Sequence, residues 1–244
     1  MYKRQIIDTI QNKKVLVSGS WSLQRQQYGE QPHWMIVVLA AMIGQIGQPG
    51  GGFGLGYSAE NGIGNPVKHF KWPALNQFKN LITDFIPVAR YSDMLLNPGK
   101  NFTFNGQTYQ YPNIKLVYWA GGNPFHHQMN LSKLRKATFK PDTIITNEIW
   151  WNSLARHADI IFPTTTTLER NDIGFRHWEQ TVSPMHKAID PIGNSRNDFD
   201  IFSLISEKLG IKEQFTENKN EEEWLKTLWD LSLIHISEPT RLQQ

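Results

Sequence analysis

Residues 114–124 read Ile114-Lys115-Leu116-Val117-Tyr118-Trp119-Ala120-Gly121-Gly122-Asn123-Pro124. Apolar and β-branched side chains dominate the first six positions, which is typical of a short buried strand. The glycines, asparagine and proline that follow are turn residues. We therefore predict a strand over residues 114–119, then a turn, then a helix over residues 128–137.

Two more strands are predicted further along the chain. Thr143-Ile144-Ile145-Thr146 ends at Asn147-Glu148, and Ile160-Ile161-Phe162 ends at Pro163 and four threonines. A helical turn over residues 150–156 separates them. Strands alternating with helices at this spacing predict an α/β fold, in which a parallel sheet is covered by helices on both faces.

The segment before residue 65 adds a strand and a helix. Residues 14–17 predict a short buried strand, and residues 31–46 predict a helix with Pro32 in its first turn. Because apolar residues run nearly all round this helix, we expect it to be buried. The segment 44–64 holds 9 of the 18 glycines, so we expect a loop, with no helix or strand interior, whose backbone runs close to another group.

The remaining segments are less regular. Residues 65–112 predict an irregular excursion with a small hairpin across Asn105-Gly106. Asp198 is expected to cap an amphipathic helix that ends at Leu209, and residues 221–229 predict a last helix.

Composition excludes several classes of protein. The 244 residues are 39% hydrophobic and 12% aromatic, which excludes a disordered chain, and the absence of cysteine excludes disulfides and thiolate metal ligands. The longest apolar run, residues 35–43, is far below the ~20 residues of a membrane span. No phosphate-binding P-loop occurs, and the adjacent His126 and His127 have no carboxylate cluster that would favour a metal site.

The two ends of the chain are predicted to be sequencing-adapter scars. Residues 231–235 read Leu-Ser-Leu-Ile-His, which CTG TCT CTT ATA CAC encodes. The reverse complement encodes Val-Tyr-Lys-Arg-Gln, or Met-Tyr-Lys-Arg-Gln from a GTG start, and the chain begins with that pentapeptide. We therefore assign residues 1–5 and 231–244 to scars and residues 6–230 to one α/β domain fragment.

Removing the two ends changes the interpretation of the net charge. The whole chain has a formal charge of +3, but without Lys3, Arg4, Arg241 and Glu238 it has 22 basic and 21 acidic side chains. The remaining charge of +1 gives no electrostatic case for a nucleic-acid partner.

Polar or glycine-rich loops follow all the predicted strands. Because the carboxyl ends of parallel strands share one edge, these loops are expected to meet there and to bind a nucleotide-sized ligand. They are residues 18–25, 121–127, 147–152 and 164–170.

Long blocks of this sequence resemble the dimethyl-sulfoxide and trimethylamine-N-oxide reductase family, which includes biotin sulfoxide reductase. The first blocks are Trp21-Ser22-Leu23-Gln24-Arg25, Tyr28-Gly29-Glu30-Gln31-Pro32 and Met42-Ile43-Gly44-Gln45-Ile46-Gly47, with Pro49-Gly50-Gly51-Gly52 close behind. The others are Tyr118-Trp119-Ala120-Gly121-Gly122-Asn123-Pro124-Phe125-His126-His127 and the segment from Arg156 to Gly174 with Thr165-Thr166-Thr167-Leu168-Glu169-Arg170-Asn171-Asp172.

The resemblance implies a molybdenum oxidoreductase with Mo-bis(molybdopterin guanine dinucleotide) as its cofactor. It implies an incomplete, Rossmann-like cofactor domain, a small N-oxide or S-oxide as substrate, an electron-donor cytochrome as partner and a periplasmic location, with cytoplasmic relatives also known. Since the molybdenum-ligating serine of this subgroup lies upstream, we name no catalytic or metal-ligating residue. We expect the fragment not to be catalytic alone.

Nine residues are candidate cofactor contacts. Glycine N–H groups at residues 121–122 suit a diphosphate, and a carboxylate suits a guanine edge. The resemblance and the strand ends together give Trp21, Ser22, Arg25, Asn123, His127, Asn147, Glu148, Asn152 and Asp159.

Other roles stay open for three of these residues and for the whole chain. Trp21 is alternatively a core aromatic, Glu148 a solvated carboxylate, and Asp159 a residue whose hydrogen bond joins a packed helix and strand. A non-catalytic nucleotide-binding α/β module is the alternative to an enzyme, and the upstream sequence distinguishes the two.

Overall fold

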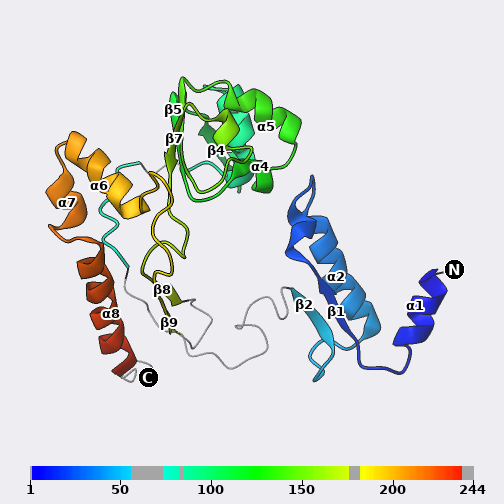
Figure 1. Ribbon diagram of the computed structural model, residues 1–244. Helices are drawn as coiled ribbons and strands as arrows, with labels where there is room; N and C mark the ends of the chain where they lie inside the picture. Colours follow the sequence, from blue (N-terminus) through cyan, green and yellow to red (C-terminus); the bar gives the residue numbers. More distant parts are fainter. Residues whose placement is uncertain (1, 56–73, 83–84, 176–181, 238–244) are drawn as a thin grey trace. The chain divides into compact units, whose positions relative to one another are not determined.

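The computed structural model describes residues 2–55, 74–82, 85–175 and 182–237 (Figure 1). The chain divides into two compact units, residues 1–68 and residues 69–244. Both units contain parallel strands, which confirms the predicted α/β class.

The first unit is a β-α-β arrangement. Strand β1 (Leu16–Gly19) pairs in parallel with β2 (Gly52–Leu55), and helix α2 (Glu30–Ile43) connects them. Helix α1 (Tyr2–Ile10) and the short η1 (Trp21–Gln24) complete the unit. The predicted strand and helix are confirmed, although β1 begins two residues later than predicted, and α2 ends earlier, where Gly44 adopts φ +76°.

The prediction that the glycine-rich segment contains no strand was wrong for residues 52–55. These residues form β2, because the left-handed Gly52 (φ +95°) lets the backbone turn into register with Leu16. The predicted close approach is confirmed at Gly51, where a Cβ atom would lie 3.0 Å from the backbone oxygen of Gln45. Residues 56–64 of this segment lie outside the described residues.

Helix α2 is not buried as predicted. Trp34 is 63% exposed and Met42 is 80% exposed, and Ala40 is the one helix residue in the buried class. The helix packs on β1, β2 and η1, which cover one side of it. An apolar pattern all round a helix therefore predicted more covering surface than the described part of this unit supplies.

A side chain at position 51 is predicted to destabilise the first unit. We expect Gly51→Val to lower the free energy of unfolding by more than the ~1 kcal/mol that separates glycine from other residues in regular structure, because the new Cβ must displace the Gln45 backbone. The control Gln48→Val adds the same side chain at an exposed loop position and should stay within ~0.5 kcal/mol of wild type. Urea unfolding of both variants measures this, and equal stabilities would show that position 51 has room.

The second unit is built on a three-stranded parallel sheet. Its order is β5 (Leu116–Ala120), β6 (Thr143–Glu148) and β7 (Ile160–Pro163). Helices α4 (Pro124–His127) and α5 (Leu131–Thr138) connect β5 to β6, and η3 (Ala155–His157) precedes β7. All three predicted strands are confirmed.

Helices cover both faces of this sheet. Neighbouring side chains on β5 point to opposite faces. Tyr118 contacts Phe202 on α6 (Asp198–Lys208), with ring centroids 5.4 Å apart, and Trp119 contacts Tyr91 on α3 (Tyr91–Leu96) at 5.3 Å. Because α3 also packs on α5, these two helices share a face and α6 takes the other.

Two antiparallel hairpins lie outside the parallel sheet. The predicted hairpin is confirmed as β3 (Asn101–Phe104) and β4 (Gln107–Gln110), with left-handed Asn105 and Gly106 in the turn. The short η2 (Val88–Arg90) precedes it in the chain. The second, β8 (Asp172–Phe175) with β9 (Val182–Met185), was not predicted.

The C-terminal part is helical. Helix α6 has Asn197, not Asp198, as its N-cap residue, because Asp198 already has a place in the first turn. Helices α7 (Lys212–Thr216) and α8 (Glu221–Ser237) follow. Since α8 includes residues 231–237, part of the predicted scar is helical, and the adapter origin of both ends stays a prediction.

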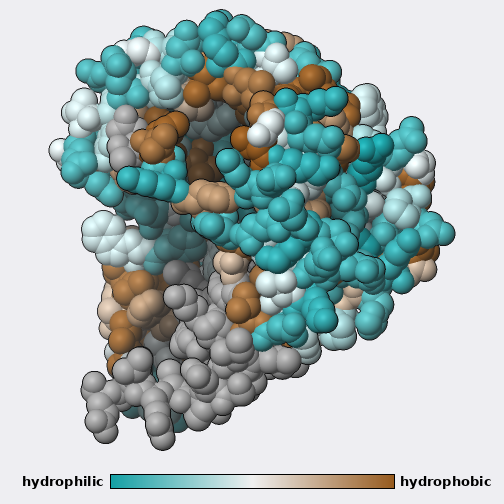
Figure 2. All heavy atoms as spheres, turned by 90° about the vertical axis from the view of Figure 1, so that its left-hand side faces the viewer, coloured by the Kyte–Doolittle hydropathy of each residue, from teal (hydrophilic) through white to brown (hydrophobic). Residues whose placement is uncertain are grey.

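Apolar side chains remain exposed on these last helices. Figure 2 shows brown residues among hydrophilic ones on the side of the molecule that carries α6, α7 and α8. The exposed large apolar residues of this segment include Leu204, Leu209, Phe215, Trp229 and Leu231. Within the described ranges, no helix is both long enough and apolar enough to span a bilayer.

Candidate functional site

A hollow of about 550 Å³ lies at the carboxyl edge of the β5-β6-β7 sheet. The loops that follow all three strands meet there, as predicted. The residues that line the hollow include Gly121, Gly122, Asn123, His126, His127, Asn147, Glu148, Trp150, Asn152, the four threonines 164–167, Arg170 and Asp198.

In the described chain, neither Gly121 N nor Gly122 N in the turn after β5 donates to a loop or turn carbonyl. Gly121 (φ +73°) and Gly122 (φ +88°) are left-handed and have no atom within 4 Å of the place where a Cβ would lie. Asn123 caps α4 by accepting a hydrogen bond from Phe125 N at 3.0 Å. Its Nδ2 atom is buried and has no partner in the described chain, although the residue is only 8% exposed. A buried donor without a protein partner is uncommon in folded proteins and marks a candidate contact for a ligand.

Asn147 holds the end of β6 in place. Its Oδ1 accepts a hydrogen bond from the Tyr118 hydroxyl at 2.8 Å, and its Nδ2 donates to Asp198 Oδ1 at 2.7 Å. Burial and the nearby Asp198 carboxylate raise the pKa of Tyr118, so the phenol stays protonated and able to donate. Asn147 thus lines the hollow mainly as a link between β5, β6 and α6.

Glu148 and Asn152 keep polar atoms available to a ligand. Glu148 Oε1 accepts a hydrogen bond from Ile149 N at 3.0 Å, and Oε2 makes no hydrogen bond to another described residue. Asn152 Oδ1 accepts from Ala155 N at 3.1 Å, which leaves its amide N–H groups for another acceptor. Trp150, between these two residues in the sequence, also lines the hollow and is 68% exposed, so it is not a core residue.

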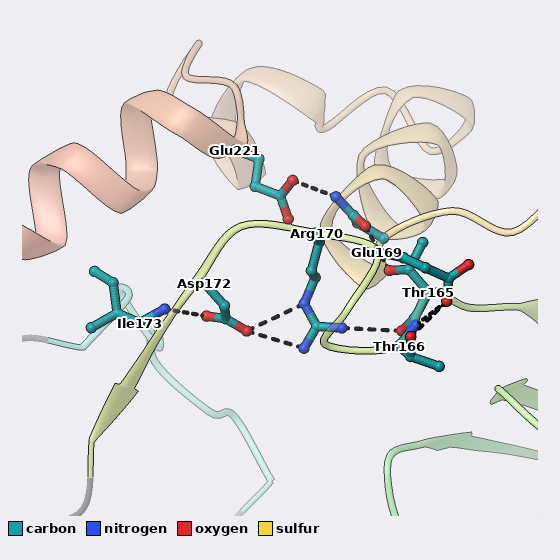
Figure 3. A network of polar contacts seen from close by, with 8 residues as sticks. Thr165, Thr166, Glu169, Arg170, Asp172, Ile173 and Glu221 are labelled. Carbon is teal, nitrogen blue, oxygen red and sulfur yellow. Dashed lines mark hydrogen bonds and ion pairs between the residues drawn. The ribbon is translucent and has the colours of Figure 1, made fainter. Parts of the chain in front are cut away.

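The threonine loop after β7 is folded around Glu169 (Figure 3). Glu169 is 4% exposed, and its Oε2 accepts hydrogen bonds from Thr166 N and Thr166 Oγ1, both at 2.7 Å. Its Oε1 accepts from Ile192 N at 2.7 Å and, more weakly, from Ser195 Oγ at 3.4 Å. These donors lower the pKa of the Glu169 carboxyl to about 2.

Arg170 is held on the other side of this loop. Its guanidinium donates to Asp172 Oδ2 from Nε at 3.2 Å and from Nη2 at 3.0 Å, and to Thr165 O from Nη1 at 3.0 Å. Thr165 Oγ1 donates to Asn197, whose Nδ2 in turn donates to Glu221. Burial and the nearby Asp200 raise the pKa of Glu221. Because Arg170 Nη2 lies 3.0 Å from the Asp172 carboxylate, the charge of Arg170 is already paired within the protein.

Asp159 is corrected from a cofactor contact to a structural residue. It precedes β7 at the amino edge of the sheet, whereas the hollow lies at the carboxyl edge. Its Oδ2 accepts a hydrogen bond from Ile144 N at 2.8 Å, and its own N–H donates to Ile144 O at 2.9 Å. Asp159 thus helps to set the register between β6 and β7. The contact joins two strands, whereas the alternative interpretation expected a hydrogen bond between a helix and a strand.

Trp21, Ser22 and Arg25 belong to the first unit. They follow the carboxyl end of β1 in and after η1, where Ser22 N donates to Ser20 Oγ at 3.4 Å. Trp21 is 44% exposed, so the core-aromatic alternative does not hold in the described unit. Their contact with the cofactor stays a prediction.

Several lining residues were not among the nine candidate contacts, although all of them except Asp198 lie in the predicted loops 121–127, 147–152 and 164–170. His126, Trp150, Thr164–Thr167, Arg170 and Asp198 line the hollow beside the predicted Asn123, His127, Asn147, Glu148 and Asn152. The four consecutive threonines at a strand end were a usable signal, but Asp198 comes from a helix far along the chain. In the described ranges, no group of three or more His, Asp or Glu side chains could hold a metal ion.

The protonation of Glu169 is predicted to destabilise the second unit. Its carboxyl has a pKa of about 2 when folded and about 4.3 when unfolded, so its stabilising effect is complete above pH ~4.3 and is lost as the pH falls through ~2. Urea unfolding at a series of pH values between 5 and 2 should show a smaller decrease for Glu169→Gln than for wild type. Parallel pH profiles would contradict this prediction.

Asp159 is predicted to act on stability and not on ligand binding. Asp159→Ala leaves Ile144 N without its side-chain partner and should lower the unfolding free energy by ~1–3 kcal/mol. The control Asp142→Ala removes an exposed carboxylate paired with Lys115 and should cost at most ~1 kcal/mol. If Asp159→Ala weakened nucleotide binding and left stability unchanged, the structural role would be wrong.

Comparison with known proteins identifies relatives along most of the sequence. Residues 4–208 match the family model described as molybdopterin oxidoreductase. The chain is 44% identical over 232 residues to a biotin sulfoxide reductase of Cereibacter sphaeroides, covering 95% of this chain and 31% of that relative.

Two further relatives show the same relation. A trimethylamine-N-oxide reductase of Haemophilus influenzae is 42% identical, covering 93% of this chain and 29% of the relative. A dimethyl sulfoxide/trimethylamine N-oxide reductase of Cereibacter sphaeroides is 43% identical, covering 90% and 28%. The chain thus spans under a third of the length of these relatives.

Proposed function

The chain belongs to the molybdopterin oxidoreductase family, and from that premise we propose that it binds the nucleotide end of a molybdopterin guanine dinucleotide. The observation that carries the proposal is the donor-rich hollow at the carboxyl edge of the β5-β6-β7 sheet. Parallel α/β sheets bind nucleotides at this edge.

The residues of the hollow fit such a group. The Gly121-Gly122 turn leaves backbone N–H groups open at the entrance to α4, and the orphaned Asn123 Nδ2 lies beside them. Neutral donors of this kind suit the oxygens of a diphosphate.

Glu148 and Asn152 supply the groups that distinguish guanine. Guanine presents N1–H and an exocyclic amine side by side, and the Glu148 carboxylate can accept from both. The Asn152 amide can donate to the neighbouring guanine O6, because its own oxygen is already bound to Ala155 N. Adenine places an acceptor at N1, which the carboxylate would repel.

We propose that the whole enzyme reduces N-oxides or S-oxides, in line with the names of its relatives. When bound, the cofactor would supply the chemistry of oxygen-atom transfer, in which two electrons and two protons convert the oxygen of the oxide to water. The residues described for this chain bind and orient the cofactor's nucleotide end. An electron-donor cytochrome and a periplasmic location complete the proposal.

Guanine recognition by Glu148 is tested with GDP and ADP as soluble probes. We expect this chain to bind GDP more tightly than ADP, and Glu148→Gln to weaken GDP binding by about ten- to a hundredfold, since bidentate base recognition is worth ~1–3 kcal/mol. ADP binding should change much less. Isothermal titration calorimetry measures both dissociation constants.

The matched control is Glu213→Gln, which removes an equal charge from α7, away from the hollow. It should leave both dissociation constants unchanged. Equal GDP affinity of wild type and Glu148→Gln would make Glu148 a solvated carboxylate, and binding of neither nucleotide to wild type would contradict the proposed function.

A further inference from the structure

Glu169 takes no part in the proposed nucleotide recognition, yet it is the most completely bonded carboxylate of the threonine loop. One of its oxygens accepts hydrogen bonds from Thr166, which lines the hollow, and the other accepts from the turn at residues 192–195. A buried carboxylate with several donors is stable only as an anion, so these donors are not available to a ligand.

The carboxylate closes a four-residue turn. Glu169 N donates to Thr166 O at 3.1 Å, while Glu169 Oε2 accepts from Thr166 N and Oγ1. The tip of this turn is Thr167-Leu168. The Leu168 carbonyl is anchored from the other side by Ala188 N at 2.7 Å and Ile189 N at 3.1 Å.

The four threonines therefore differ in what they offer a ligand. The Thr166 hydroxyl donates to Glu169 and the Thr165 hydroxyl donates to Asn197. Thr167 is exposed, lines the hollow, and its hydroxyl makes no hydrogen bond to another described residue. Its position depends on the turn that Glu169 closes.

We propose that Glu169 is a positioning residue that presents the Thr167 hydroxyl to the phosphate groups of the bound nucleotide. This proposal rests on the proposed function of the hollow. Glu169 itself does not touch the ligand. Its two carboxylate oxygens bond only to donors inside the protein, so it acts on the ligand through the shape of the turn.

The test compares a direct contact, its support and an unrelated core residue. Thr167→Ala should weaken GDP binding about tenfold without lowering the melting temperature, since it removes one hydrogen bond to a charged group. Glu169→Gln should weaken GDP binding at least as much and also lower the melting temperature. Leu134→Ala removes a fully buried core side chain and should lower the melting temperature alone. Calorimetry is done well below every melting temperature.

Two further measurements make the result decisive. Guanosine, which has no phosphate, should bind wild type and Thr167→Ala equally if the hydroxyl serves the phosphates. If Glu169→Gln does not fold, Thr166→Val removes only one of the four donors and should give a smaller loss of GDP affinity.

The outcomes separate this proposal from the proposed function. Wild type that binds GDP, with unchanged affinity in Thr167→Ala and in the Glu169 or Thr166 variant, would overturn the positioning role alone. If Leu134→Ala lost as much GDP affinity as the Glu169 variant, the loss would follow from lower stability of the fold. That result would also overturn the positioning role. Wild type that binds neither GDP nor inorganic pyrophosphate would contradict the nucleotide site itself.

Discussion

Three parallel strands must end at one edge of their sheet, and the site depends on that constraint. The backbone pairing of β6 with both β5 and β7 brings residues 120, 147 and 162 into one row. The loops that leave this row are then neighbours, although residues 120 and 162 are 42 positions apart in the sequence. Asp159 shows the opposite case, because it lies at the other edge and serves only the pairing of β6 with β7.

Polar residues at this edge divide into two groups by how far their hydrogen bonds are already satisfied. Asn147, Glu169 and Arg170 have partners within the protein for most of their polar atoms and fix the shape of the hollow. Asn123 and Glu148 retain an unused donor and an unused acceptor. Since a buried polar group without a partner is unfavourable, Asn123 indicates where a ligand contributes most, and the half-buried Glu148 offers a further acceptor.

The sequence predicted those features that depend on local pattern. Apolar runs located the three strands of the parallel sheet, and Asn105-Gly106 located the hairpin turn. Strand β2 was missed because glycine carries no side-chain pattern, and its pairing with β1 depends on residues 36 positions away. The exposure of α2 was not predictable either, because an apolar helix does not itself reveal how much surface will cover it.

Site residues follow the same division. Asn123, His127, Glu148 and Asn152 come directly after predicted strands, so their place at the hollow followed from topology. The role of Glu169 depends on Ile192 and Ser195, more than 20 residues away, and no local pattern could reveal it.

The balance of charge in the hollow leads to one further consequence. Glu148 and Asp198 bring carboxylates to it, whereas the guanidinium of Arg170 is paired with Asp172. Neutral donors can orient a diphosphate, but they do not compensate its charge. A polyanionic dinucleotide therefore needs a cation beyond Arg170. Arg25, which follows the carboxyl end of β1 and makes no ion pair in the described part of its unit, has the chemistry for that role.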